Sequence, residues 1–263
     1  MSDNNAQVKI AGHTDTGLRR KYNQDYIGFE QSSGIVVLAD GMGGHKAGEV
    51  AAQMAVDSVL KTLQSLTQQE SSVSITGSQL LEFVSNTISD SNSEIYQAAA
   101  SCEEHDGMGT TIVAAIIEGS NIYVGHVGDS RLYLYREQVL RRITKDHSLV
   151  QSLIDKGFYT EQEARNASIG NVVTRALGSR AEVEVDTRRI EMETNDIFLL
   201  CSDGLTDMVS DWQIAEIINS NIQDIDRAAN ELVDLANKYG GKDNISVILI
   251  QVLLTPENES NTL

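Results

Sequence analysis

The chain contains a short apolar run that ends in an acidic turn, Gly34-Ile35-Val36-Val37-Leu38-Ala39-Asp40-Gly41. Its length and its β-branched residues predict a buried strand that stops at Asp40-Gly41. The same pattern occurs in two later segments, Val124-Gly125-His126-Val127-Gly128-Asp129-Ser130 and Phe198-Leu199-Leu200-Cys201-Ser202-Asp203-Gly204. A fourth aspartate, Asp243, stands just before the last apolar strand. The sequence therefore predicts four carboxylates at the ends of buried strands.

These carboxylates would repel one another if the strand ends converged in the fold. A single Asp-Gly pair most often marks only a turn. Four carboxylates at one edge, in contrast, would be unfavourable unless cations neutralised them. Because all the ligand atoms would be oxygens, Mg²⁺ or Mn²⁺ is favoured over zinc or copper.

The rest of the chain predicts strands and helices in separate blocks. Apolar residues at helical spacing predict a helix over residues 46–66, then a loop over 64–78 and a second helix that ends near Ser101. Strands are expected over 111–117, 122–127, 131–135, 139–143, 183–190, 197–201 and 244–253, and helices near 211–220 and 224–239. Strands in blocks do not alternate as βαβ units, which favours antiparallel sheets packed under helices over a Rossmann or TIM architecture.

The composition is that of an acidic globular chain. It has 263 residues, 41% of them hydrophobic, and no linker-like break, which predicts a single domain. There are 38 Asp and Glu against 20 Lys and Arg, a formal net charge of -18 that argues against a nucleic-acid partner. Two stretches without Lys or Arg, 62–130 and 190–226, hold nine carboxylates each, which equals the whole imbalance. Solvated surface acidity and cation binding both account for this pattern, and both interpretations stay open.

Other sequence features bear on compartment and redox chemistry. The start of the chain lacks the basic and then apolar segments of a signal peptide, and no run of about 18 apolar residues occurs. We therefore expect a cytoplasmic chain without a membrane span. The two cysteines, Cys102 and Cys201, form no CxxC pair, which excludes a disulfide scaffold or a zinc ribbon.

Seven short motifs together resemble those of the metal-dependent PP2C-type protein serine/threonine phosphatases, and the match spans nearly the whole chain. In order, they are Arg20-Lys21-Tyr22-Asn23-Gln24-Asp25, Asp40-Gly41-Met42-Gly43-Gly44-His45, Gly109-Thr110-Thr111, Gly128-Asp129-Ser130-Arg131, Asp146-His147-Ser148, Ser202-Asp203-Gly204 and Asp243-Asn244. The Gly43-Gly44-His45 form resembles the bacterial branch. The resemblance implies an α+β fold, an α-β-β-α sandwich of two antiparallel sheets flanked by helix pairs. It also implies one catalytic domain over 1–254 with a flap over 149–178, followed by a polar tail over 255–263.

The resemblance also implies a metal centre with two ions, Mn²⁺ or Mg²⁺. Asp40 would bridge both ions, Asp203 and Asp243 would complete the first site, and Asp25 with the Gly41 carbonyl would serve the second. Ligands at strand ends and tight turns are held rigidly, which suits a metal site.

The resemblance implies one more ion site, and the chain departs from the family pattern at one residue near the second site. Asp129 and Asp203 would hold a third ion, as in many bacterial relatives. Gln24 stands where other branches carry Glu, which removes one acidic group near the second site.

The implied reaction is hydrolysis of phosphoserine and phosphothreonine in proteins by a metal-bridging hydroxide, because two cations lower the pKa of bridging water toward about 7. Arg20 would bind the phosphoryl oxygens. His45 is the candidate general acid. In some relatives a histidine directly follows the Asp-Gly pair, whereas this chain has Met42 at that position. The expected partners are phosphoproteins and a cognate bacterial Ser/Thr kinase, and the chain is expected to be a monomer.

Several alternatives compete with this interpretation. A pseudophosphatase would have broken metal ligands, whereas the aspartates that match the family are all present. A hydrolase of small phosphoesters stays open, because a metal centre recognises phosphate rather than peptide. The Gly109-Thr110-Thr111 and Asp146-His147-Ser148 motifs are expected to be structural, with Asp146 or Ser148 capping a helix. Trp212 is expected to serve in packing.

Overall fold

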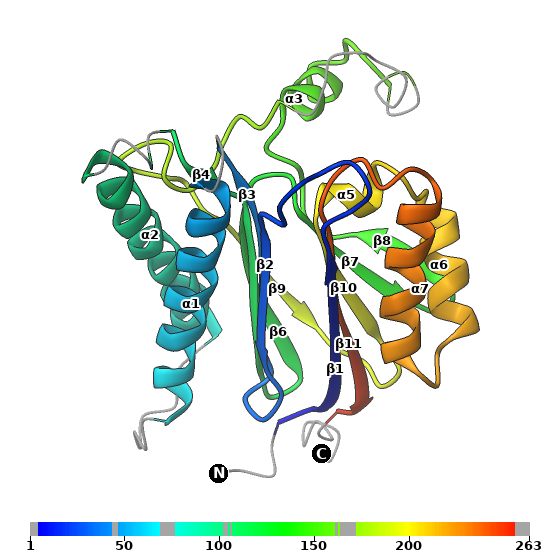
Figure 1. The fold of residues 1–263 in the computed structure, drawn as a ribbon. Helices are drawn as coiled ribbons and strands as arrows, with labels where there is room; N and C mark the ends of the chain where they lie inside the picture. Colours follow the sequence, from blue (N-terminus) through cyan, green and yellow to red (C-terminus); the bar gives the residue numbers. More distant parts are fainter. Residues whose placement is uncertain are drawn as a thin grey trace.

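Two antiparallel sheets lie face to face at the centre of the molecule (Figure 1). The computed structural model describes residues 5–43, 47–68, 77–101, 105, 107–160, 163 and 172–255. One sheet has the order β1 (Gln7–Asp15), β11 (Ile245–Leu254), β10 (Ile197–Cys201), β7 (Arg131–Arg136) and β8 (Val139–Arg142). The other has the order β2 (Asp25–Glu30), β3 (Ile35–Met42), β5 (Ile112–Glu118), β6 (Asn121–Val127) and β9 (Asp186–Glu191), and the short β4 (Gly109–Thr110) pairs with β3.

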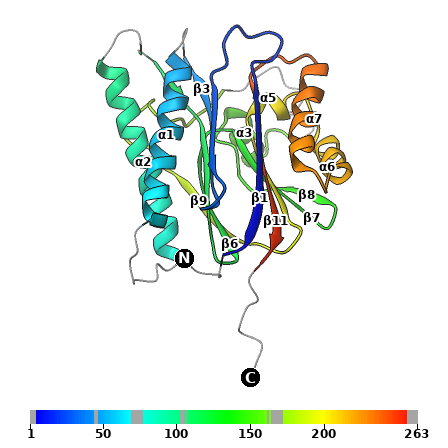
Figure 2. The ribbon, with the colours of Figure 1, turned by 60° about the horizontal axis from the view of Figure 1, so that its bottom comes forward.

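Helices cover the outer face of each sheet (Figures 1 and 2). The pair α1 (Ala47–Gln68) and α2 (Gly77–Ser101) packs on the sheet that contains β2, β3 and β6. The pair α6 (Asp211–Ser220) and α7 (Ile225–Lys238), with the short α5 (Asp203–Thr206), packs on the other sheet. Helix α3 (Leu149–Asp155) lies beyond one end of the sandwich, opposite the end at which β1 begins and β11 ends (Figure 1).

The alternation of side chains along β3 explains the four layers. Val36 and Leu38 enter the core between the sheets, where they join Leu200 of β10 and Ile248 of β11. Val37, on the opposite face of the strand, packs in the core beneath α1 and α2. Because the strand is buried on both faces, its sequence is a continuous apolar run rather than an alternating one.

The predicted fold class is confirmed, while several boundaries differ. The strands β1 and β2 were not predicted. Helix α1 ends at Gln68 and α2 begins at Gly77, so both ends of the predicted loop over residues 64–78 are helical. The remaining loop residues, 69–76, lie outside the described residues. Strand β9 begins at Asp186, three residues later than predicted. The packing role predicted for Trp212 is wrong, because its side chain is 67% exposed.

One end of the sandwich gathers the predicted metal ligands. There β3 ends, β2 and β11 begin, and β6 and β10 run out into the turns that carry the remaining aspartates. Figure 1 shows these strand ends on the side where α3 lies. Among the described residues, no helix is both long and apolar enough to cross a membrane.

Candidate metal centre

Asp25 and Asp40 are direct neighbours across the β2–β3 pair. Asp25 is buried, and its Oδ2 accepts a hydrogen bond of 2.7 Å from the Ser202 hydroxyl. Its Oδ1 is also buried and has no hydrogen-bond partner. The sequence predicted that Asp40 would follow the strand. In the structure Asp40 lies inside β3, because β3 continues to Met42 by pairing with β4. The two carboxylates are therefore fixed by a sheet rather than by a loop.

Two threonines hold the main chain at Asp40. The Thr111 hydroxyl accepts the Asp40 N–H at 3.0 Å, and the Asp40 carbonyl accepts the Thr111 N–H at 2.9 Å. The Thr110 hydroxyl donates to the same carbonyl at 2.9 Å. Thr111 also hydrogen-bonds the Ser130 hydroxyl at 2.7 Å, next to Asp129. The motif expected to be structural therefore links two of the predicted ligands.

Gly41 allows the main chain after Asp40 to touch helix α1. A Cβ built on Gly41 would lie 2.0 Å from the Gly48 carbonyl oxygen and 2.6 Å from that of Gln24. Those atoms are backbone and cannot move aside, so only glycine fits. The Gly41 N–H donates to the Gln24 carbonyl at 3.0 Å, which connects this end of β3 to the residue before Asp25.

The carboxylates of Asp129 and Asp203 come from the turns after β6 and β10. Asp129 is buried, and Asp203 is half-buried at the first turn of α5. Burial, followed by the charges of Asp203 and Asp146, raises the pKa of Asp129 to about 8. The negative charge of Asp203 therefore acts on the Asp129 carboxyl, which comes from the neighbouring turn.

Asp243 is paired with Arg20. Its Oδ2 accepts from the Arg20 guanidinium at 2.5 Å, and its Oδ1 accepts from the Asn244 N–H at 2.9 Å. Asn244 also anchors the segment between β1 and β2, since its amide donates to the carbonyls of Thr16 and Tyr22 and its Oδ1 accepts the Gln24 N–H. Arg20 thus reaches the metal end of the sandwich through a loop held by Asn244.

The pKa values reveal a concentration of negative charge. Burial raises the pKa of Asp40 well above its usual range, and the carboxylates of Asp25, Asp203, Asp129 and Asp243 raise it further, in that order. Burial likewise raises the pKa of Asp25 to about 7; the hydroxyl groups of Ser246 and Ser202 lower it, and the charges of Asp203 and Asp243 raise it further. Five predicted ligands therefore share one electrostatic environment.

This environment fits divalent cations of the hard, oxygen-binding kind. The donor atoms are carboxylate oxygens, which Mg²⁺ and Mn²⁺ prefer. The buried Oδ1 of Asp25 lacks a protein partner, and a buried polar atom without one is costly unless something else binds it. The residues present at this end therefore match the ions that the sequence implied.

Some residues of the site were predicted and others were not. His45, the candidate general acid, lies outside the described residues. Ser202 and Asn244 appeared only as parts of motifs, without the contacts that they make with Asp25 and with the loop of Arg20. Ordinary serine and asparagine residues give no signal of such roles, because the partners are distant in sequence.

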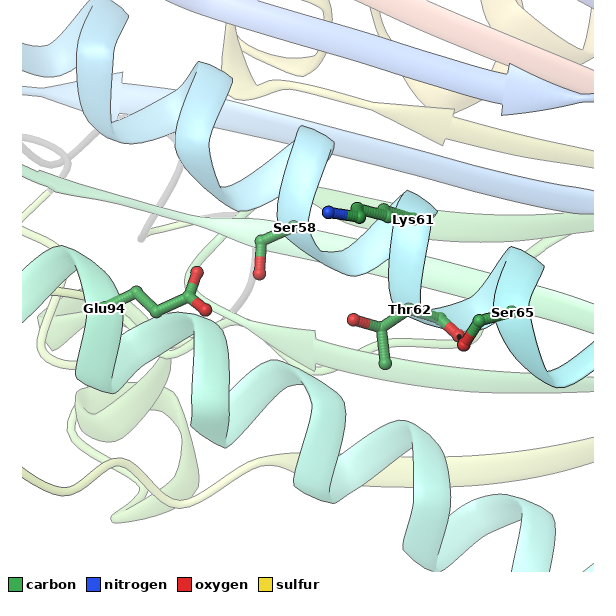
Figure 3. Close-up of a pocket in the computed structure, with 5 residues that line it drawn as sticks. All are labelled: Ser58, Lys61, Thr62, Ser65 and Glu94. Carbon is green, nitrogen blue, oxygen red and sulfur yellow. Dashed lines mark hydrogen bonds between the residues drawn. The ribbon is translucent and has the colours of Figure 1, made fainter.

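Two other features contain none of the predicted metal ligands. Among the described residues, His126, His147 and Asp186 have ligand atoms within 4.8 Å of one another. A polar groove between α1 and α2 is lined by Ser58, Lys61, Thr62, Ser65 and Glu94 (Figure 3). None of these residues was predicted as a site residue, and the groove lies in the outer helical layer.

Comparison with known proteins gives the family. The protein phosphatase 2C profile matches residues 12–249. The chain belongs to the protein phosphatase 2C family. A relative from Listeria monocytogenes, named serine/threonine phosphatase stp, is 42% identical over 92% of this chain and 95% of its own length.

Solved structures of the family agree with the fold. The Mycobacterium tuberculosis serine/threonine phosphatase PstP/Ppp has a TM-score of 0.83 and 36% identity, covering 94% of this chain and 99% of that one. A catalytic domain of PstP in complex with two manganese ions has a TM-score of 0.81 and 36% identity, covering 94% of this chain and 98% of that one. The predicted family, the sandwich fold and the phosphatase enzyme class are therefore confirmed, and family membership supports metal dependence.

Proposed function

We propose that this member of the family hydrolyses phosphoserine and phosphothreonine in proteins, with two Mn²⁺ or Mg²⁺ ions and a third, weaker ion. The names of the relatives support the substrate class, and the manganese complex of PstP supports the ion pair. The observation that carries the proposal is the group of five aspartates at one end of the sandwich. Two of them, Asp25 and Asp129, are buried, and this burial raises the pKa of each carboxyl well above its usual range.

The aspartates would divide the ions between them. Asp40 would bridge two ions, with Asp203 and Asp243 on the first and Asp25 with the Gly41 carbonyl on the second. When bound, the ions supply positive charge that neutralises phosphoryl oxygens and lowers the pKa of water.

Asp129 would bind the third ion together with Asp203. Its position one residue after the Gly128 turn, and its charge interaction with Asp203, support this pairing. This third ion, with only the carboxylates of Asp129 and Asp203, would bind more weakly than the two ions that share the carboxylates of the first and second sites.

Arg20 would exchange partners when substrate arrives. Its guanidinium pairs with Asp243, and both side chains are partly exposed, at 49% and 36%. A carboxylate that binds a cation holds an arginine less tightly, so Arg20 would turn to the phosphoryl oxygens. Asn244 would keep the loop of Arg20 in reach during this exchange.

His45 would protonate the departing serine or threonine oxygen. Histidine suits this role because its ordinary pKa is near neutrality. The support for His45 is its place in the motif that begins at Asp40, two residues after Gly43, whose φ is +143°.

The proposal extends to the organisation of the chain. Residues 1–254 would form the catalytic domain and 149–178 a flap beside the metal centre, which the position of α3 beyond the strand ends supports. A phosphatase of this class would act as a monomer in the cytoplasm and oppose a Ser/Thr kinase, whose phosphorylated products are its substrates.

Hydrolysis assays with phosphopeptides, an aryl phosphate and a nucleoside monophosphate test the function. We expect turnover of phosphoserine and phosphothreonine peptides in Mn²⁺ or Mg²⁺ that is lost in chelator, with the nucleotide much the poorer substrate. Activity that survives chelation would contradict metal dependence, and faster nucleotide turnover would favour a small-phosphoester hydrolase. Tight Mn²⁺ binding without turnover of any substrate would indicate a binding protein.

A further inference from the structure

His147 lies in a partly buried cluster that connects the Asp129 turn with the segment 172–177. Its ring stacks on that of His126, with ring centroids 4.7 Å apart and planes 16° from parallel. Both rings lie close to Asp186, and the guanidinium of Arg175 adjoins them. The roles proposed above for the aspartates leave this cluster without a function.

A transition-metal site is the first interpretation of two histidines and a carboxylate, and two observations contradict it. The Gly128 N–H donates to His147 Nδ1 at 3.0 Å, so Nδ1 carries the lone pair and Nε2 carries the hydrogen of the neutral ring. An Nε2–H group cannot bind a metal. The Arg175 guanidinium, which donates to Asp186 at 2.7 Å and lies 3.1 Å from Nε2, already brings a positive charge to that place.

The contacts of His147 with Gly128 form a closed clamp. The side chain accepts the Gly128 N–H, and the His147 N–H donates to the Gly128 carbonyl at 2.9 Å. Gly128 has a φ of +109°, a conformation that side-chain-bearing residues avoid, and a Cβ there would lie 2.6 Å from Thr111. The clamp therefore stabilises an unusual turn whose next residue is Asp129.

The main chain of His147 continues this connection to the segment 172–177. Its carbonyl accepts the Thr174 N–H at 2.8 Å, and Leu149 N–H donates to the Val172 carbonyl at 2.8 Å. Farther along the same segment, Leu177 exchanges two main-chain hydrogen bonds with Thr110, whose hydroxyl donates to the Asp40 carbonyl. One extended segment thus contacts the supports of both Asp129 and Asp40.

We propose that His147 is a positioning residue of the metal centre, which fixes the Gly128 turn that carries Asp129 and joins that turn to the segment 172–177. The proposal rests on the proposed function, because it takes Asp129 as an ion ligand. Burial, followed by the charges of His126 and Arg175, lowers the pKa of His147, in agreement with a neutral ring.

Three substitutions at His147 separate the clamp from simple packing. His147→Asn keeps an acceptor close to the position of Nδ1, whereas His147→Gln moves the amide toward the position of Nε2. His147→Phe keeps a ring without any acceptor. His126→Phe is the matched control, because it changes the stacked neighbour and leaves the Gly128 clamp in place.

The first measurement is amide hydrogen exchange of Gly128 in the full chain without metal, which requires no catalysis. We expect exchange to accelerate about tenfold in the Gln and Phe variants at position 147, as for loss of one buried hydrogen bond, and little in His147→Asn or His126→Phe. Thermal unfolding of each variant, followed by circular dichroism, shows that it is folded. Equal exchange in the Asn and Gln variants would overturn the proposal.

The second measurement is calorimetric Mn²⁺ titration, with the Mn²⁺ concentration for half-maximal phosphopeptide turnover measured alongside. We expect the Gln and Phe variants to weaken the weakest Mn²⁺ site about tenfold and to leave the two tight sites intact, since groups that orient a ligand act on affinity. Equal loss in His126→Phe would show a packing role and overturn the proposal. The proposal would also be overturned if the wild type bound one equivalent of Zn²⁺ and His126→Phe abolished that binding. The histidine cluster, including His147 Nε2, would then be a metal site.

These measurements distinguish failure of the inference from failure of the proposed function. If the wild-type chain bound Mn²⁺ without turning over phosphopeptides, Gly128 exchange and Mn²⁺ affinity would still test the clamp. If turnover were normal and the substitutions at position 147 had no selective effect, the phosphatase function would stand and the inference would fall.

Discussion

Removing the charge of Asp25 should stabilise the metal-free enzyme at high pH. The carboxyl is 5% exposed, and its pKa is raised from 3.8 to about 7, chiefly by burial. One pKa unit is about 1.4 kcal/mol, so this shift corresponds to a destabilisation of about 4 kcal/mol when Asp25 is ionised. Because the folded state holds the proton more tightly than the unfolded state, the penalty is absent below about pH 4, grows as the pH rises, and is complete above about pH 7.

Asp25→Asn is the appropriate substitution. The amide oxygen can still accept the Ser202 hydroxyl, and the amide nitrogen takes the place of the buried Oδ1 that lacks a partner. At pH 8 without metal, we expect the variant to be more stable than the wild type by up to about 4 kcal/mol, or roughly 10 °C in Tm for a chain of this size. The difference should vanish near pH 4. In excess Mn²⁺ the order should reverse, because ion binding stabilises the wild type more.

Thermal unfolding in chelator from pH 4.5 to 8.5 measures this effect. Asp234→Asn on the exposed face of α7 is the control, because it removes one negative charge from a solvent-exposed side chain that is not a predicted ligand. A variant that is less stable than the wild type at pH 8 would refute the reasoning. So would a stability difference of the same size at every pH, since that would arise from packing and not from ionisation.

Three further predictions concern the other proposed site residues. Asp40→Asn should reduce turnover in saturating Mn²⁺ below about a tenth of wild type, which is an increase in the activation barrier above about 1.4 kcal/mol, while the fold persists. More activity than this in steady-state assays would mean that Asp40 does not bridge the two ions. Asp129→Ala should keep two tight Mn²⁺ sites in calorimetry and raise the Mn²⁺ concentration needed for full rate; loss of a tight site would contradict the third-ion role. Arg20→Ala should raise KM for phosphopeptides and aryl phosphates alike, whereas His45→Ala should lower kcat for phosphopeptides far more than for aryl phosphates, whose leaving group needs little protonation. Equal losses on both substrates in the His45 variant would assign the proton to another group.

Strands buried on both faces could be predicted from the sequence, whereas two strands with mixed exposure, β1 and β2, could not. Strand β10 has the predicted bounds because it is a continuous apolar run, and β11, which is apolar apart from Ser246 and Gln251, begins and ends within one residue of its predicted bounds. Strands β1 and β2 mix buried with half-exposed and exposed residues and include polar side chains and glycine. Their identity as strands depends on pairing with β11 and β3, and the pairing of β1 joins the two ends of the chain. A local sequence pattern does not contain that information.

The metal end shows the same division between local and long-range signals. The order of the seven motifs along the chain is a local signal that predicts the family, and the family comparison confirms it. The contacts that support the aspartates were not predictable, because Ser202 bonds a residue 177 positions away and the two histidines of the partly buried cluster are 21 positions apart. The expected cap was found, since the Ser148 side chain accepts the Gln151 N–H at the start of α3.

The distribution of acidic residues separates two causes of the negative charge. Of the predicted ligands, only Asp129 and Asp203 lie in the two stretches that lack Lys and Arg. The same stretches contain exposed carboxylates on the outer helices, among them Glu82 and Asp90 of α2 and Glu216 of α6. Those side chains keep their water and gain little from a cation, whereas a carboxylate buried like Asp25 loses its water and gains much. Net charge alone therefore says little about metal binding here, and the informative quantity is how many carboxylates the fold buries together.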